Sequence, residues 1–256
     1  MEGLDLGALN VYVPTFMYVL LRTSMFMAFM PLFGQETFPI QFKVGMALAL
    51  ALVITPVVDF HSGGASMAML VVREIVLGLA MGAATRFVFE AVNVGGQLIA
   101  MAKGLRAGEV YDPQFGQSGE ISQLLGSLAT LQFLAMNGHH DLLYVFVKSY
   151  DIVPAGGADI KAVAMQILPL GGRVLVLGLK IAAPVMVVAF LANIAMGFIG
   201  KAAPSLNILM TSFPVFILVG VFVMYLSVPV FMTLLDGQFL SIRETFMGVL
   251  MAAGGR

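Results

Sequence analysis

The residues best placed to do chemistry form a polar stripe inside an apolar stretch of the chain, residues 67–103. Four of them recur at helical spacing, and these are Arg86, Glu90, Asn93 and Gln97. On a helix the four side chains fall within an arc of about 60°. An ionised group costs roughly 2.5–3.5 kcal/mol at the centre of a bilayer, so the stripe must face protein or water and not lipid.

Two kinds of chemistry suit this stripe. It is either a seam of ion pairs and hydrogen bonds that packs the helix against its own chain or against other subunits, or a path along which a solute or proton crosses a membrane. The sequence leaves both alternatives open. We call the ionisable and amide residues of this stretch the polar seam: Arg73, Glu74, Arg86, Glu90, Asn93 and Gln97.

Catalytic and metal-binding chemistry has little support in the sequence. His139, His140 and Asp141 are adjacent, but neighbouring positions on a helix point in different directions, and no HExxH motif or matched carboxylate pair is present. The chain has no cysteine, which excludes disulfides and thiolate sites. No Gly-x-x-x-x-Gly-Lys phosphate loop occurs, and no nucleophile lies at workable spacing from a base. We therefore expect no enzyme, no metal and no cofactor.

The composition indicates that the elements carrying these residues lie in a membrane. Hydrophobic residues make up 60% of the 256 residues and charged residues only 11%, whereas soluble proteins carry about 25% charged residues. Thirteen basic and fourteen acidic residues nearly cancel, which gives no indication of nucleic-acid binding. Glu2 and Asp5 stand where a signal peptide would carry Lys or Arg, so we expect no cleaved leader.

Long apolar runs without polar alternation predict helices and not barrel strands. Breaker residues divide the chain into six predicted helices at 9–30, 40–58, 67–103, 120–150, 160–200 and 207–251. The predicted fold class is therefore all-α and membrane-associated, with residues 1–256 forming one helical unit. Gly78 and Gly82 have the spacing that permits close approach of a second helix.

Two of the predicted helices have the wrong length for simple membrane spans. Residues 67–103 would extend about 55 Å, against a hydrocarbon core of about 30 Å. Residues 207–251 are longer still and contain Pro214 and Pro229, which kink or break helices. These elements are either hairpins turned inside the membrane or long bent helices that leave the bilayer plane. If the six predicted helices crossed the membrane in alternation, the loops on each side would carry four Lys or Arg residues. The sequence therefore predicts no membrane orientation.

The connection 104–119 is unusually long, because helix connections in bundles usually have 2–8 residues. It combines glycines, a turn and apolar anchors, and its candidate functional residues are Leu105, Arg106, Gly108, Val110, Tyr111, Asp112, Pro113, Phe115 and Gly116. A segment of this kind can rest in a cavity and swing aside as a gate does. We call it the plug loop. The alternative is an ordinary surface loop with aromatic interface anchors.

A series of short motifs runs in order along most of the chain. They are Pro39 with residues 43–50 (KVGMALAL), Glu74-Ile75-Val76-Leu77-Gly78 with Arg86, Gly96-Gln97-Leu98-Ile99, Asp112-Pro113, Asn137-Gly138-His139, residues 193–197 (NIAMG), residues 203–207 (APSLN) and Phe213-Pro214. Their order and spacing resemble the FliR family of flagellar export-gate proteins and its type III secretion relatives. One departure is that Val215 and Phe216 follow the Phe-Pro pair, where a basic residue is frequent in that family.

The resemblance implies a core structural subunit of the flagellar type III secretion export gate. Such a subunit would form, with FliP-like and FliQ-like membrane partners, a channel for unfolded export substrates, in association with the larger export-gate and ring proteins. It also implies about six long, kinked helices arranged as hairpins in an oligomer, with the plug loop closing the pore. The expected location is the bacterial inner membrane at the flagellar basal body, partly above the bilayer plane and in contact with membrane lipid.

An alternative from another class of protein remains. The polar stripe of Arg86, Glu90, Asn93 and Gln97 could serve a secondary transporter or proton-coupled permease near the bilayer midplane. Helices broken at Pro214 and Pro229 would suit such a transporter, although no inverted repeat is visible in the sequence. Uptake of a small solute by the single protein would favour the permease, and co-purification with other membrane subunits would favour the export gate.

Overall fold

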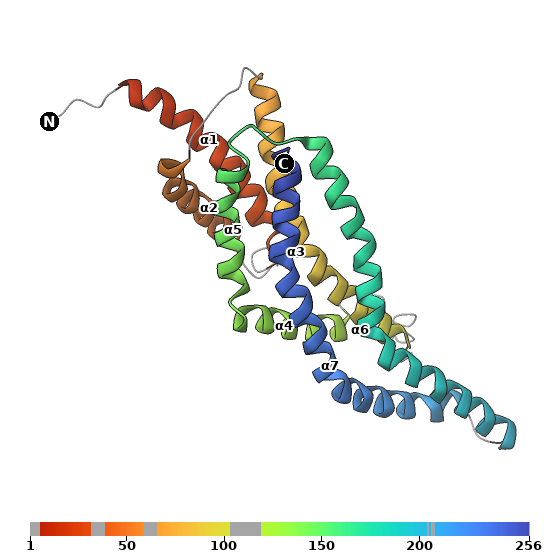
Figure 1. The fold of residues 1–256 in the computed structure, drawn as a ribbon. Coiled ribbons are helices and arrows are strands. Elements are labelled where there is room, and N and C mark those ends of the chain that lie inside the picture. The colour runs from red at the N-terminus through yellow and green to blue at the C-terminus, as the bar shows by residue number, and fades with distance from the viewer. Residues whose placement is uncertain are drawn as a thin grey trace. The chain divides into compact units, whose positions relative to one another are not determined.

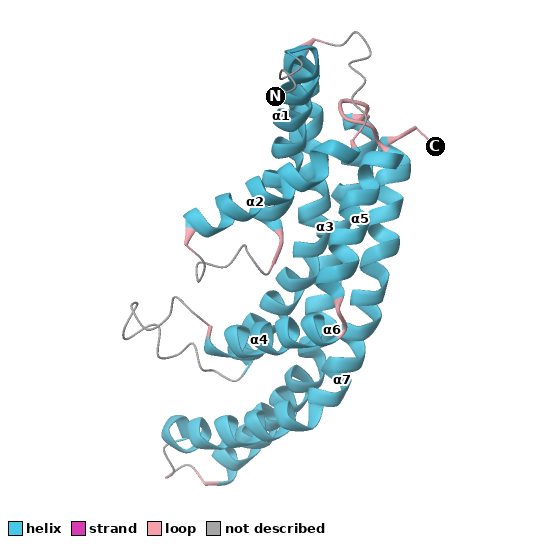
Figure 2. Ribbon diagram, turned by 90° about the vertical axis from the view of Figure 1, so that its left-hand side faces the viewer, coloured by secondary structure: helices cyan, strands magenta, loops and turns pink. Residues whose placement is uncertain are grey.

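A computed structural model describes residues 6–31, 39–58, 66–102, 119–203, 205 and 208–255. Within these ranges the regular structure is helical and contains no β-strand (Figure 1, Figure 2). The helices are α1 Leu6–Phe29, α2 Ile40–Ile54 with the short 3-10 helix η1 Thr55–Val57, α3 Met67–Ala102, α4 Glu120–Ala135, α5 Gly138–Ile152, α6 Ile160–Ala202 and α7 Ile208–Ala253. The prediction of an all-α protein is confirmed.

Four helical segments of the described chain are long and apolar enough to cross a membrane. They are Ile40–Val57, Met67–Ala102, Ile160–Ala202 and Met210–Ala253. The protein is therefore an all-α membrane protein, as the composition predicts. The second, third and fourth of these segments contain 36, 43 and 44 residues, so each is far longer than the roughly 20 residues that a bilayer requires. Pro214 and Pro229 lie inside α7 without ending it.

The predicted helix 120–150 is two helices in the structure. The backbone of Asn137 is left-handed, with a φ of 57°, and it separates α4 from α5. Asparagine is one of the few residues besides glycine that tolerates this conformation. The amide of His140 donates to the Asn137 carbonyl at 2.9 Å, which starts the new helix. The prediction of one helix is wrong here, because the polar stretch 137–141 begins with Asn-Gly, which is typical of turns and not of a helix interior.

The start of α6 is fixed by a side chain. The Asp159 carboxylate accepts hydrogen bonds from the amides of Lys161 at 2.9 Å and Ala162 at 3.4 Å. A carboxylate at this position satisfies amide groups that the first turn of a helix leaves without partners. The Asp159 amide in turn donates to the carbonyl of Ala253 at 2.9 Å, so the start of α6 is tied to the end of α7.

The chain divides into two compact units. Unit 1 contains residues 1–87, 137–171 and 239–256, and unit 2 contains residues 88–136 and 172–238. Helices α3, α6 and α7 each contribute one part to unit 1 and another to unit 2. Within the described residues, each unit has its own packed interior.

The interior of unit 1 is built on aromatic contacts and one close helix pair. Phe26 stacks on Phe146 with centroids 4.5 Å apart and meets the edge of Phe246 at 6.2 Å. A Cβ atom added to Gly78 would lie 2.5 Å from the Arg22 carbonyl oxygen, and one added to Gly82 would lie 2.5 Å from the Phe29 Cβ. The predicted role of these two glycines in close helix approach is confirmed, because no larger residue fits between α1 and α3.

The interior of unit 2 brings α3 against both α4 and α6 at adjacent residues. A Cβ atom on Gly96 would lie 2.5 Å from the Ser122 Cα of α4, and one on Gly95 would lie 2.9 Å from the Ile181 Cγ2 of α6. Phe89 meets the edge of Phe133 with centroids 5.6 Å apart. The end of α3 that precedes the plug loop is therefore held on two sides.

Candidate functional site

The most deeply buried charges of the described chain form an ion pair between α1 and α3 in unit 1. Arg22 and Glu74 are both completely buried. Arg22 Nε donates to Glu74 Oε2 at 2.6 Å, and Arg22 Nη2 donates to Glu74 Oε1 at 2.9 Å. This two-pronged geometry is the strong form of an arginine–carboxylate contact. We call the pair and its partners the Arg22–Glu74 clasp.

Every donor of the Arg22 guanidinium has a partner in the clasp. Arg22 Nη1 donates to the Ser149 hydroxyl at 3.1 Å and to the Val153 carbonyl at 3.2 Å, and Nη2 donates to the same carbonyl at 3.2 Å. An arginine has five N–H donors, and all five are used. The clasp thus ties α1, α3 and α5 together and leaves the guanidinium no donor with which to bind a ligand.

The Tyr150 ring covers one face of the Arg22 guanidinium. The Arg22 guanidinium carbon lies 4.1 Å from the centroid of the Tyr150 ring, within the range of a cation–π contact. The Tyr150 hydroxyl donates to the Val19 carbonyl at 3.4 Å. Burial raises the pKa of the Tyr150 phenol well above its ordinary value. The phenol therefore stays neutral at physiological pH and acts as a packing surface and not as an acid.

Arg73 and Glu74 share one partner, Gly156, in the segment between α5 and α6. The Gly156 amide donates to Glu74 Oε1 at 2.6 Å, and the Gly156 carbonyl accepts from Arg73 Nη1 at 2.8 Å. The backbone of Gly156 has a φ of 81°, and a Cβ atom there would lie 2.3 Å from Leu70 Cδ2. Glycine is required at this position for both reasons.

The second part of the polar seam lies in unit 2 and forms a ladder along α3. Asn93 Nδ2 donates to Glu90 Oε1 at 3.3 Å, and Gln97 Nε2 donates to Asn93 Oδ1 at 3.4 Å. The Ser122 hydroxyl of α4 donates to the Asn93 carbonyl at 3.2 Å. Glu90, Asn93 and Gln97 are half-buried. The structure thus brings these three side chains together, as the helical spacing predicts.

Arg86 is placed differently from the other seam residues. It belongs to unit 1 and is exposed, with its guanidinium carbon 5.8 Å from the centroid of the Phe29 ring. No described carboxylate lies within salt-bridge distance of it. The polar seam therefore has three parts. Arg73 and Glu74 are hydrogen-bonded in unit 1, Glu90, Asn93 and Gln97 form the ladder in unit 2, and Arg86 is exposed. Its role as a seam or a pathway remains a prediction.

Another polar contact in unit 2 joins α4 to α7. Gln132 Nε2 donates to Asp236 Oδ1, and both side chains are partly buried. Together with the Asn93 contact, this bond gives α4 a polar tie to each of two helices. Neither residue stands out in the sequence, because nothing in the spacing of Gln132 and Asp236 relates them.

The histidines at the start of α5 lie close together. The ring centroids of His139 and His140 are 4.2 Å apart, so the expectation that adjacent histidines point in different directions is wrong at this helix end. Among the residues that the structure describes, no group of three or more His, Cys, Asp or Glu side chains is arranged to hold a metal ion. The plug loop residues from Leu105 to Gly116 lie outside the described residues.

Sequence reasoning missed five members of the clasp: Arg22, Ser149, Tyr150, the Val153 carbonyl and the Gly156 amide. One signal could have found the first. Arg22 interrupts an otherwise apolar helix, and a cation in such a helix requires a buried acid. Glu74 is the acid that occupies the corresponding apolar stretch of α3. No sequence signal points to the hydroxyl or the carbonyl.

Together, the apolar helices and the Arg22–Glu74 pair define a helical membrane protein whose completely buried charges are paired within the chain. The family described as bacterial export proteins, family 1, matches residues 13–242 of the chain. The chain belongs to this family, which confirms the resemblance seen in the motifs.

Several curated relatives carry the same name. The chain is 28% identical over 229 residues to the flagellar biosynthetic protein FliR of Escherichia coli strain K12, covering 88% of this chain and 86% of the relative. It is 26% identical over 249 residues to that of Bacillus subtilis strain 168, covering 94% and 96%. It is 27% identical over 230 residues to that of Caulobacter vibrioides, covering 86% and 90%.

Proposed function

We propose that the protein is a structural subunit of a flagellar protein-export apparatus in the bacterial inner membrane, at the flagellar basal body. The observation that carries this proposal is the family match over residues 13–242. The match covers α2 to α6 in full and most of α1 and α7. Relatives from distant bacteria, all named flagellar biosynthetic protein FliR, support the same role. The protein acts by assembly and conduction and has no catalytic step of its own.

In this proposal the subunit assembles with FliP-like and FliQ-like membrane proteins into a channel for unfolded substrates. The exposed Arg86 and the half-buried Glu90–Asn93–Gln97 ladder support assembly, because polar groups on an apolar helix need protein or water beside them. The overlong α3, α6 and α7 support a position partly above the bilayer plane, since a bilayer covers only about 20 residues of helix. The larger export-gate and ring proteins would surround this core.

Co-purification tests the assembly. The tagged chain, expressed with the genes that neighbour it, should be recovered as one large complex with other membrane subunits, and its mass should give the stoichiometry. Recovery of the chain alone, together with uptake of a small solute by vesicles that contain it, would overturn the proposal in favour of a permease.

The proposed plug function of residues 104–119 has its own test. Deletion of 110–115 should leave the complex intact but raise the ion conductance of the closed channel in planar bilayers, because the apolar anchors that seat the loop are removed. Replacement of Val110, Tyr111 and Phe115 by serine keeps the loop length and should give a smaller leak. Conductance equal to that of the unaltered complex in both variants would refute the plug and leave the export role standing.

A further inference from the structure

A polar cleft of about 270 Å³ lies in unit 1, where the start of α3 meets the start of α6. A water molecule takes up about 30 Å³ in the liquid, so the cleft has room for a small polar group of several atoms. We call it the Arg73–Asp159 cleft. Its lining residues are Met69, Arg73, Gly157, Ala158, Asp159 and Ile160.

Arg73 contributes a cation that the described chain does not neutralise. Within the described ranges its one hydrogen bond runs from Nη1 to the Gly156 carbonyl at 2.8 Å, and no carboxylate lies within salt-bridge distance. An arginine has five N–H donors, so four are left for a ligand, whereas Arg22 has none. The side chain is half-buried, and a guanidinium in such a place suits the oxygens of a phosphate or carboxylate.

Asp159 brings the opposite charge to the same cleft. Its Oδ1 atom caps α6 by accepting from the amides of Lys161 and Ala162, while Oδ2 accepts no hydrogen bond from the described chain. Asp159 is exposed and is not within salt-bridge distance of Arg73. The cleft therefore carries a cation and an anion that do not pair with each other. A ligand that bears both charges can bind to both.

The walls of the cleft are held by backbone hydrogen bonds. The Gly156 amide donates to the Glu74 carboxylate at 2.6 Å, and the Asp159 amide donates to the Ala253 carbonyl at 2.9 Å. These bonds fix the segment between α5 and α6 against α3 and α7. The cleft is therefore preformed, and a ligand binds to it without first ordering the chain.

The cleft lies where apolar helices end. Of the segments long enough to cross a membrane, α3 begins at Met67 and α6 at Ile160, and α7 ends at Ala253, all at this end of unit 1 (Figure 1). The ends of such helices are expected at the level of lipid headgroups. Large apolar side chains are exposed near the start of both α3 and α6, and these are Met67, Met69, Val72, Met165 and Leu168. The surroundings therefore favour an amphipathic ligand.

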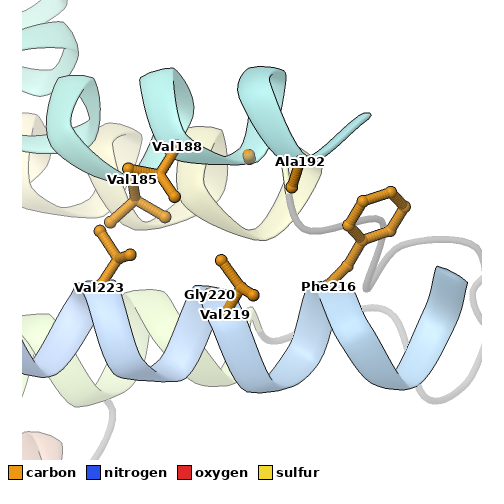
Figure 3. A pocket seen from close by; sticks show the side chains of 8 residues that line it. Val185, Val188, Ala192, Phe216, Val219, Gly220 and Val223 are labelled. Atoms are coloured by element: carbon orange, nitrogen blue, oxygen red, sulfur yellow. The ribbon is translucent and has the colours of Figure 1, made fainter. Parts of the chain in front are cut away.

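A cavity in unit 2 lacks these properties. Figure 3 shows it between α6 and α7, lined by apolar residues that include Val185, Val188, Phe216 and Val223. Its volume is about 10 Å³, which holds no more than one water molecule. It has neither the space nor the charge for a ligand, so the two cavities differ in kind.

We propose that the Arg73–Asp159 cleft binds the headgroup of phosphatidylethanolamine, a zwitterionic phospholipid. The lipid phosphate accepts hydrogen bonds from Arg73, and the primary ammonium group donates to the Asp159 carboxylate. The acyl chains extend along the exposed apolar side chains at the start of α3 and α6. This site goes beyond the proposed export role and does not depend on it.

Native mass spectrometry of the intact complex tests the site, after delipidation in detergent and addition of phosphatidylethanolamine or phosphatidylglycerol. Asp159→Asn keeps an oxygen that caps α6 but removes the charge. It should bind phosphatidylethanolamine about tenfold more weakly, because a charge-assisted contact is lost. Its binding of phosphatidylglycerol, which has no ammonium group, should not change. Asp151→Asn is the matched control, since Asp151 is exposed on α5 and does not line the cleft.

Arg73→Gln should weaken the binding of both lipids, because both carry the phosphate that Arg73 holds. Glycerophosphoethanolamine, the same headgroup without acyl chains, should displace the lipid only at a much higher concentration. Equal binding of phosphatidylethanolamine by Asp159→Asn and Asp151→Asn would overturn the proposal. Equal affinity for the lipid and for glycerophosphoethanolamine would overturn it too, in favour of a soluble zwitterion. Neither result would alter recovery of the complex, which tests the export role separately.

Discussion

The two units of the chain differ in where their charge lies and in what covers their apolar surface. Unit 1 buries a complete ion pair, Arg22 with Glu74, and satisfies every donor of the arginine within the chain. Unit 2 has a half-buried ladder of Glu90, Asn93 and Gln97 and two uncharged helix segments, 181–200 and 208–235, with exposed apolar side chains. The buried charges of unit 1 are therefore satisfied within the chain, whereas the polar side chains of the unit 2 ladder stay partly open to their surroundings.

The largest effect is expected on removal of one member of the clasp. Glu74→Ala leaves Arg22 charged, buried and without its carboxylate, which should lower the stability of the protein by about 3–5 kcal/mol. Thermal unfolding followed by size-exclusion chromatography would measure the loss. Asp236→Asn in unit 2 is the matched control. It keeps a hydrogen-bond acceptor for Gln132 and should cost only about 0.5–1.5 kcal/mol.

A double substitution separates the cost of the unpaired charge from the cost of the lost hydrogen bonds. Arg22→Met combined with Glu74→Leu removes both charges and fills the space with apolar atoms, so it should recover most of the stability that Glu74→Ala loses. Equal losses in the double and single variants would show that the hydrogen bonds to Ser149 and Val153, and not the unpaired charge, carry the effect.

The next largest effect is expected where helices approach most closely. Gly78→Ala would place a Cβ atom 2.5 Å from the Arg22 carbonyl oxygen, and separating the α1 and α3 backbones should cost about 1–3 kcal/mol. Gly126→Ala in α4 is the control, since a Cβ atom there meets nothing within 4 Å. That variant should gain about 0.5–1 kcal/mol because alanine is the better helix former. Chemical denaturation in detergent would compare the two.

A smaller effect is expected from the aromatic face of the clasp. Tyr150→Leu removes a buried ring 4.1 Å from the Arg22 guanidinium and should cost about 2 kcal/mol. Tyr144→Leu is the matched control, because Arg243 lies 5.6 Å from that exposed ring, where such contacts contribute about 0.5–1 kcal/mol. Similar losses in the two thermal unfolding curves would mean that burial adds nothing to the contact.

Much of this fold is predictable from the sequence, because helical periodicity and length are local properties. The predicted helix 67–103 differs from α3 by one residue, and the predicted contact role of Gly78 and Gly82 follows from spacing alone. The break at Asn137 has a signal in the sequence, the Asn137-Gly138 pair, which is typical of turns, but the prediction of one helix over 120–150 did not use it.

The polar seam is only partly predictable from the sequence for a related reason. Spacing on one helix places Glu90, Asn93 and Gln97 on a common face, since all three positions belong to the same rigid element. The clasp instead joins residues 52 and 127 positions apart, and such pairs depend on how helices pack. Arg22 was therefore seen as an interruption of a helix and not as the partner of Glu74.

The smallest effect on the single chain, and the most informative about the seam, is expected for Arg86→Ala. Arg86 is exposed and its contact with Phe29 is long, so its loss should change the stability of the isolated chain by only about 0.5–1 kcal/mol.

If the seam joins subunits, the same variant should sharply lower recovery of the assembled complex, because the neighbouring subunit would lose the Arg86 cation with which it pairs. Arg243→Ala, also exposed and beside an aromatic ring, is the control and should assemble normally. Full recovery of the complex with Arg86→Ala would refute the intersubunit seam, and the ladder of unit 2 would then be best explained as packing within the chain or as part of a conducting path.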